Sequence, residues 1–282
     1  MRIKIVLHCG SLLAMLCFNS AVLSATPSSL STEVGMDDHN GHNFYISGRH
    51  QFDNKLQVNA GTGKSQSSES SGRTLDASSY LIGIRTDTAA LFSAGVDKSH
   101  ARQSDNLTID SWIFTLEVNT LDWNVFVSPE TRDINVATNN NQADFDFASN
   151  GYLAGLSYYG WEPFYLSGYR SSYDYPERIS KINSRPNFFS TLFGTDTFNQ
   201  IYALEDERGT IEAGYFFTDA SISLSHGQGR SAVDQSVSTV NRIYLGYRLS
   251  STWSIKTTAG TSSIDTSTTT TTFGSLGLTY KW

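Results

Sequence analysis

The sequence predicts an all-β fold: a closed antiparallel β-barrel whose strands cross a membrane. Three observations support this prediction. Apolar and polar residues alternate in segment after segment, short and long connections alternate between the segments, and the chain ends on an alternating run with a terminal aromatic residue. Together they are typical of strands that turn one face toward lipid and the other toward water.

The alternation has period two and begins near Asn43. Thirteen segments show it, and each is predicted to be a strand. The predicted strands are 43–52, 55–64, 77–86, 90–100, 108–119, 123–133, 147–158, 164–173, 210–218, 220–229, 240–249, 252–261 and 272–282.

The connections between these segments are sorted by length. Tight turns are expected at 53–54, 87–88, 121–122, 160–163, 218–219 and 250–251, and longer polar stretches at 65–74, 101–106, 135–146, 173–209, 231–239 and 262–271. Short periplasmic turns and longer extracellular loops distinguish a transmembrane barrel from a soluble sandwich.

The glycines help to decide which face of the strands points inward. On the predicted strands they lie on the polar face: Gly61, Gly83, Gly95, Gly155, Gly214, Gly246, Gly260 and Gly277. Glycine in a strand marks a bend or a close approach, and a lumen wall requires both. The apolar face would then meet lipid, with Tyr80, Trp112, Trp123, Tyr158, Tyr247, Trp253 and Tyr280 as aromatic residues at the membrane interfaces.

The carboxyl-terminal run is the most specific signal in the sequence. Leu276, Leu278, Tyr280 and Trp282 alternate with polar or small residues up to the last position. This run resembles the assembly signal of bacterial outer-membrane β-barrel proteins. The resemblance implies a location in the cell outer membrane, with the barrel-assembly machinery as a partner during biogenesis and outer-membrane lipid and lipopolysaccharide as neighbours.

The count of thirteen strands conflicts with closure, because single-chain bacterial barrels have an even number of antiparallel strands. Ser29–Met36 is the best candidate for a further strand, since Leu30, Val34 and Met36 share one face, with a turn at 37–41. Fourteen strands are therefore preferred. The alternative is twelve, with a disordered mature N-terminus and one false strand.

The chain is predicted to begin with an export signal. A basic start and an apolar run from Ile5 to Phe18 precede small residues that end at Ala25, which is typical of a secretory signal peptide at 1–25. Residues 26–42 would form an N-terminal segment containing the possible first strand, and 43–282 the barrel. Both cysteines, Cys9 and Cys17, lie in the signal, so the mature chain should hold no disulfide or thiolate site.

The charge balance excludes nucleic acid as a partner. The chain has 20 Lys and Arg against 27 Asp and Glu, whereas nucleic-acid binding requires a basic face. No cofactor, metal site or catalytic group is expected.

Eight charged residues are predicted to point into the lumen. They are Arg49, Arg85, Asp97, Glu117, Glu212, Arg242, Arg248 and Lys256. One interpretation is a weakly anion-preferring constriction lined by Arg49, Arg85, Arg248 and Lys256. The other is an internal network of salt bridges that satisfies buried charges. The segment 173–209 could enter the lumen as a plug or form an extended hairpin outside.

The function predicted from these features is a porin-like channel for small hydrophilic solutes. The alternative is a closed barrel that serves as a surface receptor, adhesin or structural protein. A lipid-modifying enzyme or a protease is disfavoured. Asp144 and Asp146 resemble half of the catalytic set of the omptin proteases, but His226 has Leu224 where that family's pattern requires an aspartate.

Overall fold

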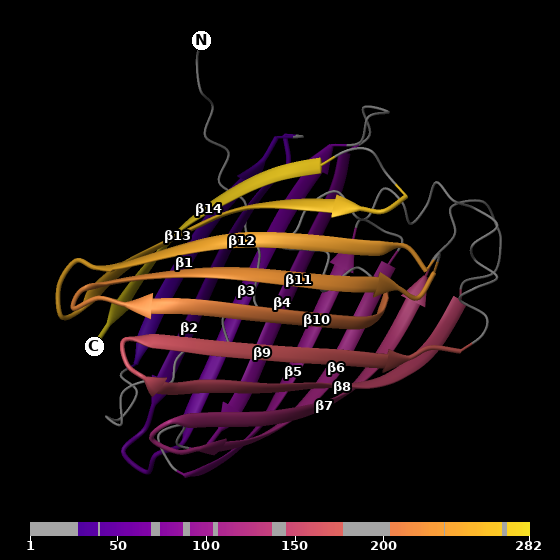
Figure 1. Cartoon of the computed structure of the whole chain (residues 1–282). Helices are drawn as coiled ribbons and strands as arrows, with labels where there is room; N and C mark the ends of the chain where they lie inside the picture. Colours follow the sequence, from indigo (N-terminus) through magenta and orange to yellow (C-terminus); the bar gives the residue numbers. More distant parts are fainter. Residues whose placement is uncertain are drawn as a thin grey trace.

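The computed structural model describes residues 28–38, 40–68, 74–86, 91–103, 107–136, 145–176, 204–233, 235–266 and 270–282. They form a closed barrel of 14 antiparallel strands (Figure 1). The strands are β1 (Ser29–Asp37), β2 (His42–Gln51), β3 (Gln57–Ser68), β4 (Thr74–Arg85), β5 (Phe92–Gln103), β6 (Leu107–Asn119), β7 (Trp123–Val136), β8 (Phe145–Trp161), β9 (Phe164–Asp174), β10 (Glu205–Phe216), β11 (Ala220–Ser231), β12 (Val237–Arg248), β13 (Trp253–Ile264) and β14 (Thr270–Lys281).

Closure occurs between β1 and β14, which pair antiparallel from Ser29↔Lys281 to Asp37↔Phe273. The Trp282 N–H donates to the Ser28 carbonyl at 3.0 Å and extends this ladder by one bond. The predicted strand at Ser29–Met36 is therefore confirmed, together with the count of fourteen. The alternative of twelve strands is wrong, because the N-terminal segment supplies the partner that the last strand requires.

The turn between β1 and β2 also lies where the sequence predicts it. The Asp37 N–H donates to the Gly41 carbonyl at 3.0 Å, and the Gly41 N–H donates to Asp37 Oδ1 at 2.7 Å. Asn40 adopts a positive φ of 61°, a conformation that asparagine tolerates better than most residues. This turn sets the register of β1 against β2.

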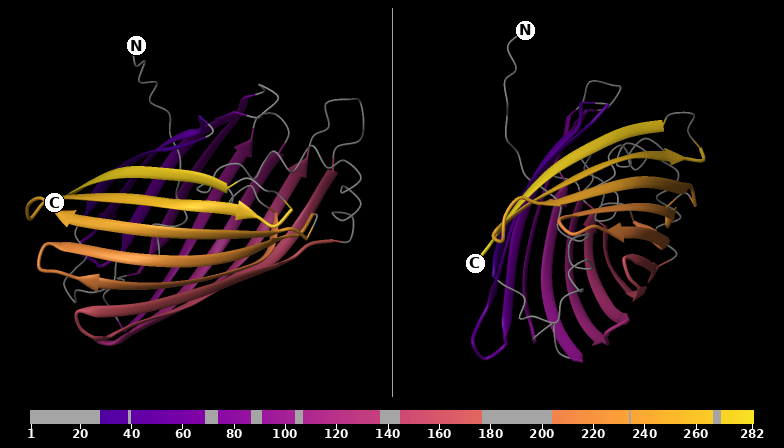
Figure 2. Two further views of the ribbon diagram at one scale, coloured as in Figure 1. Left: turned by 45° about the horizontal axis from the view of Figure 1, so that its top comes forward. Right: turned by 60° about the vertical axis from the view of Figure 1, so that its left-hand side comes forward.

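The two ends of the barrel differ in their connections. The C-terminus lies at the end where tight hairpins join β2 to β3, β6 to β7, β8 to β9, β10 to β11 and β12 to β13 (Figure 2). Several strands run further toward the opposite end than predicted: β5 continues to Gln103, so the first half of the loop expected at 101–106 belongs to a strand. Beyond the lipid both faces of a strand can be polar, and the alternating signal then disappears although the pairing continues.

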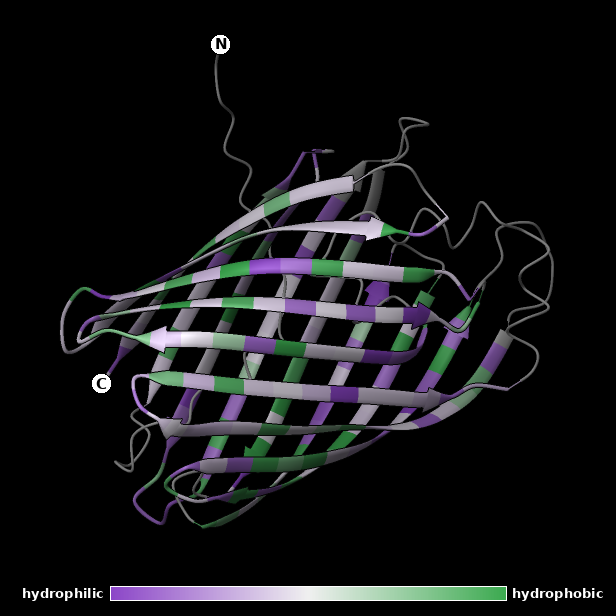
Figure 3. Ribbon diagram, viewed as in Figure 1, coloured by the Kyte–Doolittle hydropathy of each residue, from purple (hydrophilic) through white to green (hydrophobic). Residues whose placement is uncertain are grey.

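The outward face carries the apolar residues. Large hydrophobic side chains are solvent-exposed on every second position, including Phe114, Leu116, Val125, Leu245 and Leu276, and Figure 3 shows hydrophobic and hydrophilic residues alternating along individual strands. Aromatic rings cluster on this face, with Trp123 4.4 Å from Tyr158 and Trp253 4.8 Å from Tyr280 between ring centroids. A soluble barrel would bury this face, so the arrangement is that of a barrel embedded in lipid.

Candidate solute pathway through the lumen

The inner face of the barrel consists largely of small hydroxyl residues. In β11 every inward position is serine or glycine, from Ser221 to Ser231. Elsewhere inward serines are buried between larger neighbours: Ser79, Ser93, Ser111, Ser128, Ser149, Ser157, Ser167, Ser238 and Ser262. The inward glycines and charges were predicted from the sequence and these serines were not, although their shared parity with the glycines is visible there.

Large inward side chains lie over glycines of the neighbouring strand. A Cβ atom on Gly214 would come within 2.2 Å of the Tyr165 ring, and one on Gly155 within 2.3 Å of the Phe126 ring. In both cases the two residues are direct partners in the ladder. Because the glycines leave room, these rings pack along the wall, as in small barrels where large and small inward residues alternate.

Arg85 and Asp97 form a buried ion pair, and it too occupies space that glycines leave free. Arg85 Nη2 lies 2.8 Å from Asp97 Oδ2, and Asp97 is fully buried. The Asn59 amide donates to Asp97 Oδ1 at 2.9 Å. A Cβ on Gly83 would lie 1.8 Å from that same oxygen, and one on Gly95 would lie 2.5 Å from Arg85 Cγ. The pair therefore occupies the space that two opposed glycines provide.

Arg49 points inward from β2 beside this pair. It is the ladder partner of Asn59, and Arg85 lies close enough for the two positive charges to repel each other. Arg49 forms no ion pair with any residue that the structure describes. This part of the wall, on β2–β5, therefore carries a surplus positive charge.

Glu117 points inward from β6 near the end that carries the tight hairpins. The Ser93 hydroxyl donates to Glu117 Oε2 at 3.1 Å, and the Asn124 amide donates to Glu117 Oε1. Its carboxylate is therefore held by neutral donors of the two neighbouring strands.

Glu130 and Arg132 form a second buried pair, which the sequence analysis missed. They are two positions apart on β7 and each is 6% exposed, with Arg132 Nε 2.7 Å from Glu130 Oε1. The Tyr173 hydroxyl donates to Glu130 Oε2 at 2.7 Å, and the Arg132 guanidinium lies 3.6 Å from the centroid of the Tyr173 ring. Both residues fall on the inward parity of a predicted strand, so their inward direction could have been inferred. The tyrosine that covers them comes from β9 and could not.

Further pairs line β9–β11. The Arg208 Nε donates to Glu205 Oε2 at 2.7 Å, and both residues are almost fully buried. Glu212 is 6% exposed and accepts a hydrogen bond from the Tyr165 hydroxyl at 2.5 Å. On this wall Arg208 is thus neutralised by Glu205, whereas Glu212 is held by a neutral donor.

The remaining three predicted residues lie on β12 and β13. Arg242 is half-buried on the inward face, and the Lys256 ammonium lies 4.8 Å from the centroid of the Tyr244 ring. Arg248 ends β12 at the rim, is 63% exposed and lies 4.0 Å from Asp219 of the adjacent turn. Arg242 and Lys256 therefore face the lumen, whereas Arg248 projects from its edge.

An apolar cluster lies inside the mouth opposite the C-terminus. It joins inward residues of β5–β7 to two residues from connections: Ala101, Leu107, Ile109, Ile134, Val136, Leu204 and Val233. Leu204 precedes β10, and its carbonyl accepts a hydrogen bond from the Ala232 N–H at 2.6 Å. The cluster therefore places apolar side chains on the inner face at this mouth. Most of the loop at 173–209 lies outside the described residues, so its predicted role as a plug stays a prediction.

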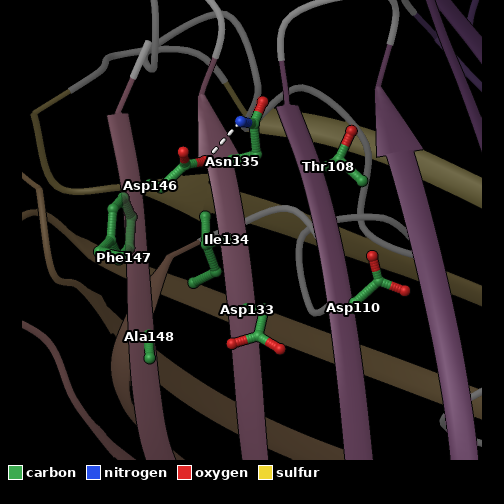
Figure 4. Close-up of a pocket in the computed structure, with 8 residues that line it drawn as sticks. All are labelled: Thr108, Asp110, Asp133, Ile134, Asn135, Asp146, Phe147 and Ala148. Atoms are coloured by element: carbon green, nitrogen blue, oxygen red, sulfur yellow. Dashed lines mark hydrogen bonds between the residues drawn. The ribbon is translucent and has the colours of Figure 1, made fainter.

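Asp146 and His226, the two residues of the protease resemblance that the structure describes, lie on different strands and form hydrogen bonds with other partners. Asp146 points outward and accepts a hydrogen bond from the Asn135 amide at 2.5 Å (Figure 4), and Asp144 lies outside the described residues. His226 is on the outward face of β11, where its Nδ1 is 2.8 Å from Asn241 Oδ1. Among the described residues no group of three or more His, Cys, Asp or Glu is placed to hold a metal ion.

These observations define a class. A closed barrel with an even number of antiparallel strands, an apolar outer face and a polar inner face is a transmembrane barrel of the bacterial outer-membrane kind.

Comparison with known proteins agrees on the fold. No family model matches the sequence, and no curated protein sequence matches it. Among solved structures, the CymD monoaromatic hydrocarbon channel is similar with a TM-score of 0.60 at 8% identity, over 92% of this chain and 89% of that one. The KdgM porin has a TM-score of 0.45 at 12% identity, over 90% and 99% of the two chains. The NanC porin has a TM-score of 0.46 at 8% identity, over 90% and 100%.

Proposed function

We propose that the protein is a porin-like channel that passes small hydrophilic solutes across the outer membrane. The observation that carries this proposal is the packing of large inward side chains over glycines of the neighbouring strand. Side chains arranged in this way follow the wall, and with the inward serines they make the inner face of the barrel polar. A 14-stranded barrel is also wider than the eight-stranded kind, whose side chains can fill the interior.

We propose a weak preference for anions in this channel. Arg85, Arg132 and Arg208 are each neutralised by a buried carboxylate. Arg49 and Lys256 have no such partner among the described residues and would act on a passing solute. Charges that line a narrow lumen act at close range on permeant ions.

Planar-bilayer recording of the refolded barrel tests both statements. The expected result is a conductance above background whose reversal potential in a salt gradient indicates a modest excess of anion flux. A barrel that is folded, as judged by heat-modifiable migration on gels, and yet passes no current would overturn the channel assignment.

The alternative of a closed barrel with a surface role is supported by the apolar cluster at one mouth. Deleting 177–203 separates the two proposals, because this change retains Leu204 and the Glu205–Arg208 pair. A channel that is already open should keep its conductance within a small factor. A silent barrel that begins to conduct after the deletion would show that this segment closes it.

A further inference from the structure

A column of basic side chains lies on the lipid-facing side of β5. Lys98, His100 and Arg102 occupy alternate positions of the strand. They point outward, because Asp97, Ala101 and Gln103, which have the opposite parity, are buried on the inner face. At about 3.3 Å per residue the column extends about 13 Å along the strand.

A fourth basic residue lies beside this column on β3. Lys64 is the ladder partner of Ser78, and Ser78 is the partner of Arg102. Lys64 and Arg102 are therefore level with each other, two strands or about 10 Å apart, with only a small side chain between them. We call Lys64, Lys98, His100 and Arg102 the basic sector.

Exposed aromatic rings border the basic sector on both sides. Tyr80 stacks on His100 with ring centroids 4.9 Å apart, and the Lys98 ammonium lies 5.1 Å from the centroid of the Trp112 ring. Tyr80 and Trp112 are about half exposed on the outward face, where tyrosine and tryptophan mark the level of the lipid headgroups. The aromatic rings thus place the basic groups at the boundary between acyl chains and headgroups.

The basic character does not continue onto the adjacent strands β6–β8. On the neighbouring strands β6–β8 the outward positions at this end hold Asp110, Asp133 and Asp146, with Thr108 and Asn135 (Figure 4). Asp110 reaches back to the sector, lying 3.5 Å from Lys98 Nζ and 3.2 Å from His100 Nδ1. This carboxylate holds the two basic side chains in place on the wall. The carboxylate of Asp76, on the outward face of β4, accepts a hydrogen bond from the Gln66 amide at 2.9 Å.

We propose that the basic sector binds the phosphate groups of a phosphorylated glycolipid in the outer leaflet, with its sugar or acyl portion against Tyr80 and Trp112. Lysine and arginine are the residues that pair with phosphate oxygens. The occupant is a lipid because the site faces the bilayer, lies at headgroup depth and is bordered by rings that suit an amphipathic molecule.

Binding of bisphosphorylated lipid A to the whole barrel in detergent, measured by native mass spectrometry, tests the proposal. The variant Lys98→Gln/Arg102→Gln should bind about 25-fold more weakly, since each surface lysine or arginine contributes about fivefold to attraction by anionic lipid. The charge-conserving variant Lys98→Arg/Arg102→Lys should bind within about twofold of the wild type. Arg230→Gln is the matched control, because Arg230 is an exposed basic residue on the outward face of β11, outside the basic sector. It should leave binding unchanged.

Two further probes separate the sources of the phosphate. Lipid A without its phosphates should bind the wild-type barrel weakly. Its affinity should be about that of intact lipid A for the Lys98→Gln/Arg102→Gln variant. Inorganic phosphate should compete poorly, since it lacks the portion that contacts the rings. Equal binding of the phosphate-free lipid would overturn the proposal, and so would a double variant that binds like the wild type. Inorganic phosphate that competes as strongly as lipid A would assign the site to free anions and overturn the lipid assignment. Heat-modifiable migration of each variant verifies that the barrel is folded.

Discussion

The inner walls of β2–β5 and β7–β10 use the same residue types in different ways. On β2–β5 the pair Arg85–Asp97 joins two strands and leaves Arg49 beside it as a surplus cation. On β7–β10, Glu130 pairs with Arg132 and Glu205 pairs with Arg208, each within one strand, and we call these two buried ion pairs closed pairs. Tyr173 covers the first of them. The difference shows that most lumen charges stabilise the wall and that few remain to act on a solute.

Breaking a closed pair should have the largest effect. Arg132→Met leaves Glu130 buried without its cation, and removing one partner of a buried pair costs about 3–5 kcal/mol. Urea unfolding of the barrel in lipid vesicles, followed by tryptophan fluorescence, measures this loss. Arg230→Met removes an arginine from an exposed cluster and should shift the midpoint only slightly. Equal shifts of the urea midpoint for the two variants would show that the Glu130–Arg132 pair has no special structural role.

Filling the glycine site on the other wall should have an intermediate effect. Gly83→Ala places a Cβ against Asp97, and overpacking of this kind costs about 1–3 kcal/mol. Gly48→Ala is the matched control, because the atom nearest to an added Cβ there is 3.9 Å away. The same urea series compares the two. If Gly48→Ala destabilises the barrel as much as Gly83→Ala does, the close approach at Gly83 is not the cause.

Removing the charge of Arg49 or Lys256 should have the smallest effect. It should change the ion selectivity of the channel and not its stability. A unit charge about 10 Å from a permeant ion in water contributes about 0.4 kcal/mol, or about twofold in relative permeability. Arg49→Gln and Lys256→Gln should each lower the anion-to-cation permeability ratio by that amount in bilayer recordings. Arg170→Gln, on the outward face and paired with Glu207, should leave the ratio unchanged. A ratio that also stays constant for Arg49→Gln would place the selective charges elsewhere.

Much of the fold could be predicted from the sequence, because one face of each strand meets lipid and its alternation is unmistakable. Even the strand at Ser29–Met36 followed from the requirement for an even count. The strand ends were less predictable: β10 begins at Glu205, five residues before the predicted strand, because no apolar face marks the part outside the lipid.

For the charged residues of the lumen, the sequence predicted which side chains point inward but not which residues they pair with. Parity places Arg85 and Asp97 on the inward face, but their contact depends on the register of β4 against β5, and a shift of one residue would turn one of them outward. Arg248 has inward parity and projects from the rim, because it is the last residue of its strand. The Glu130–Arg132 pair depends on a tyrosine from β9, so neither composition nor periodicity reveals its cover.

The joint between β1 and β14 has a consequence for how the molecule forms. It hydrogen-bonds residues at opposite ends of the sequence, so the strand made first keeps an unpaired edge until the strand made last arrives. Contacts between such distant residues slow folding and expose strand edges in the meantime. A polypeptide that stops short of its final strand would have no ring to close, and the tyrosine and tryptophan at its carboxyl end would be missing from the outer surface of the joint.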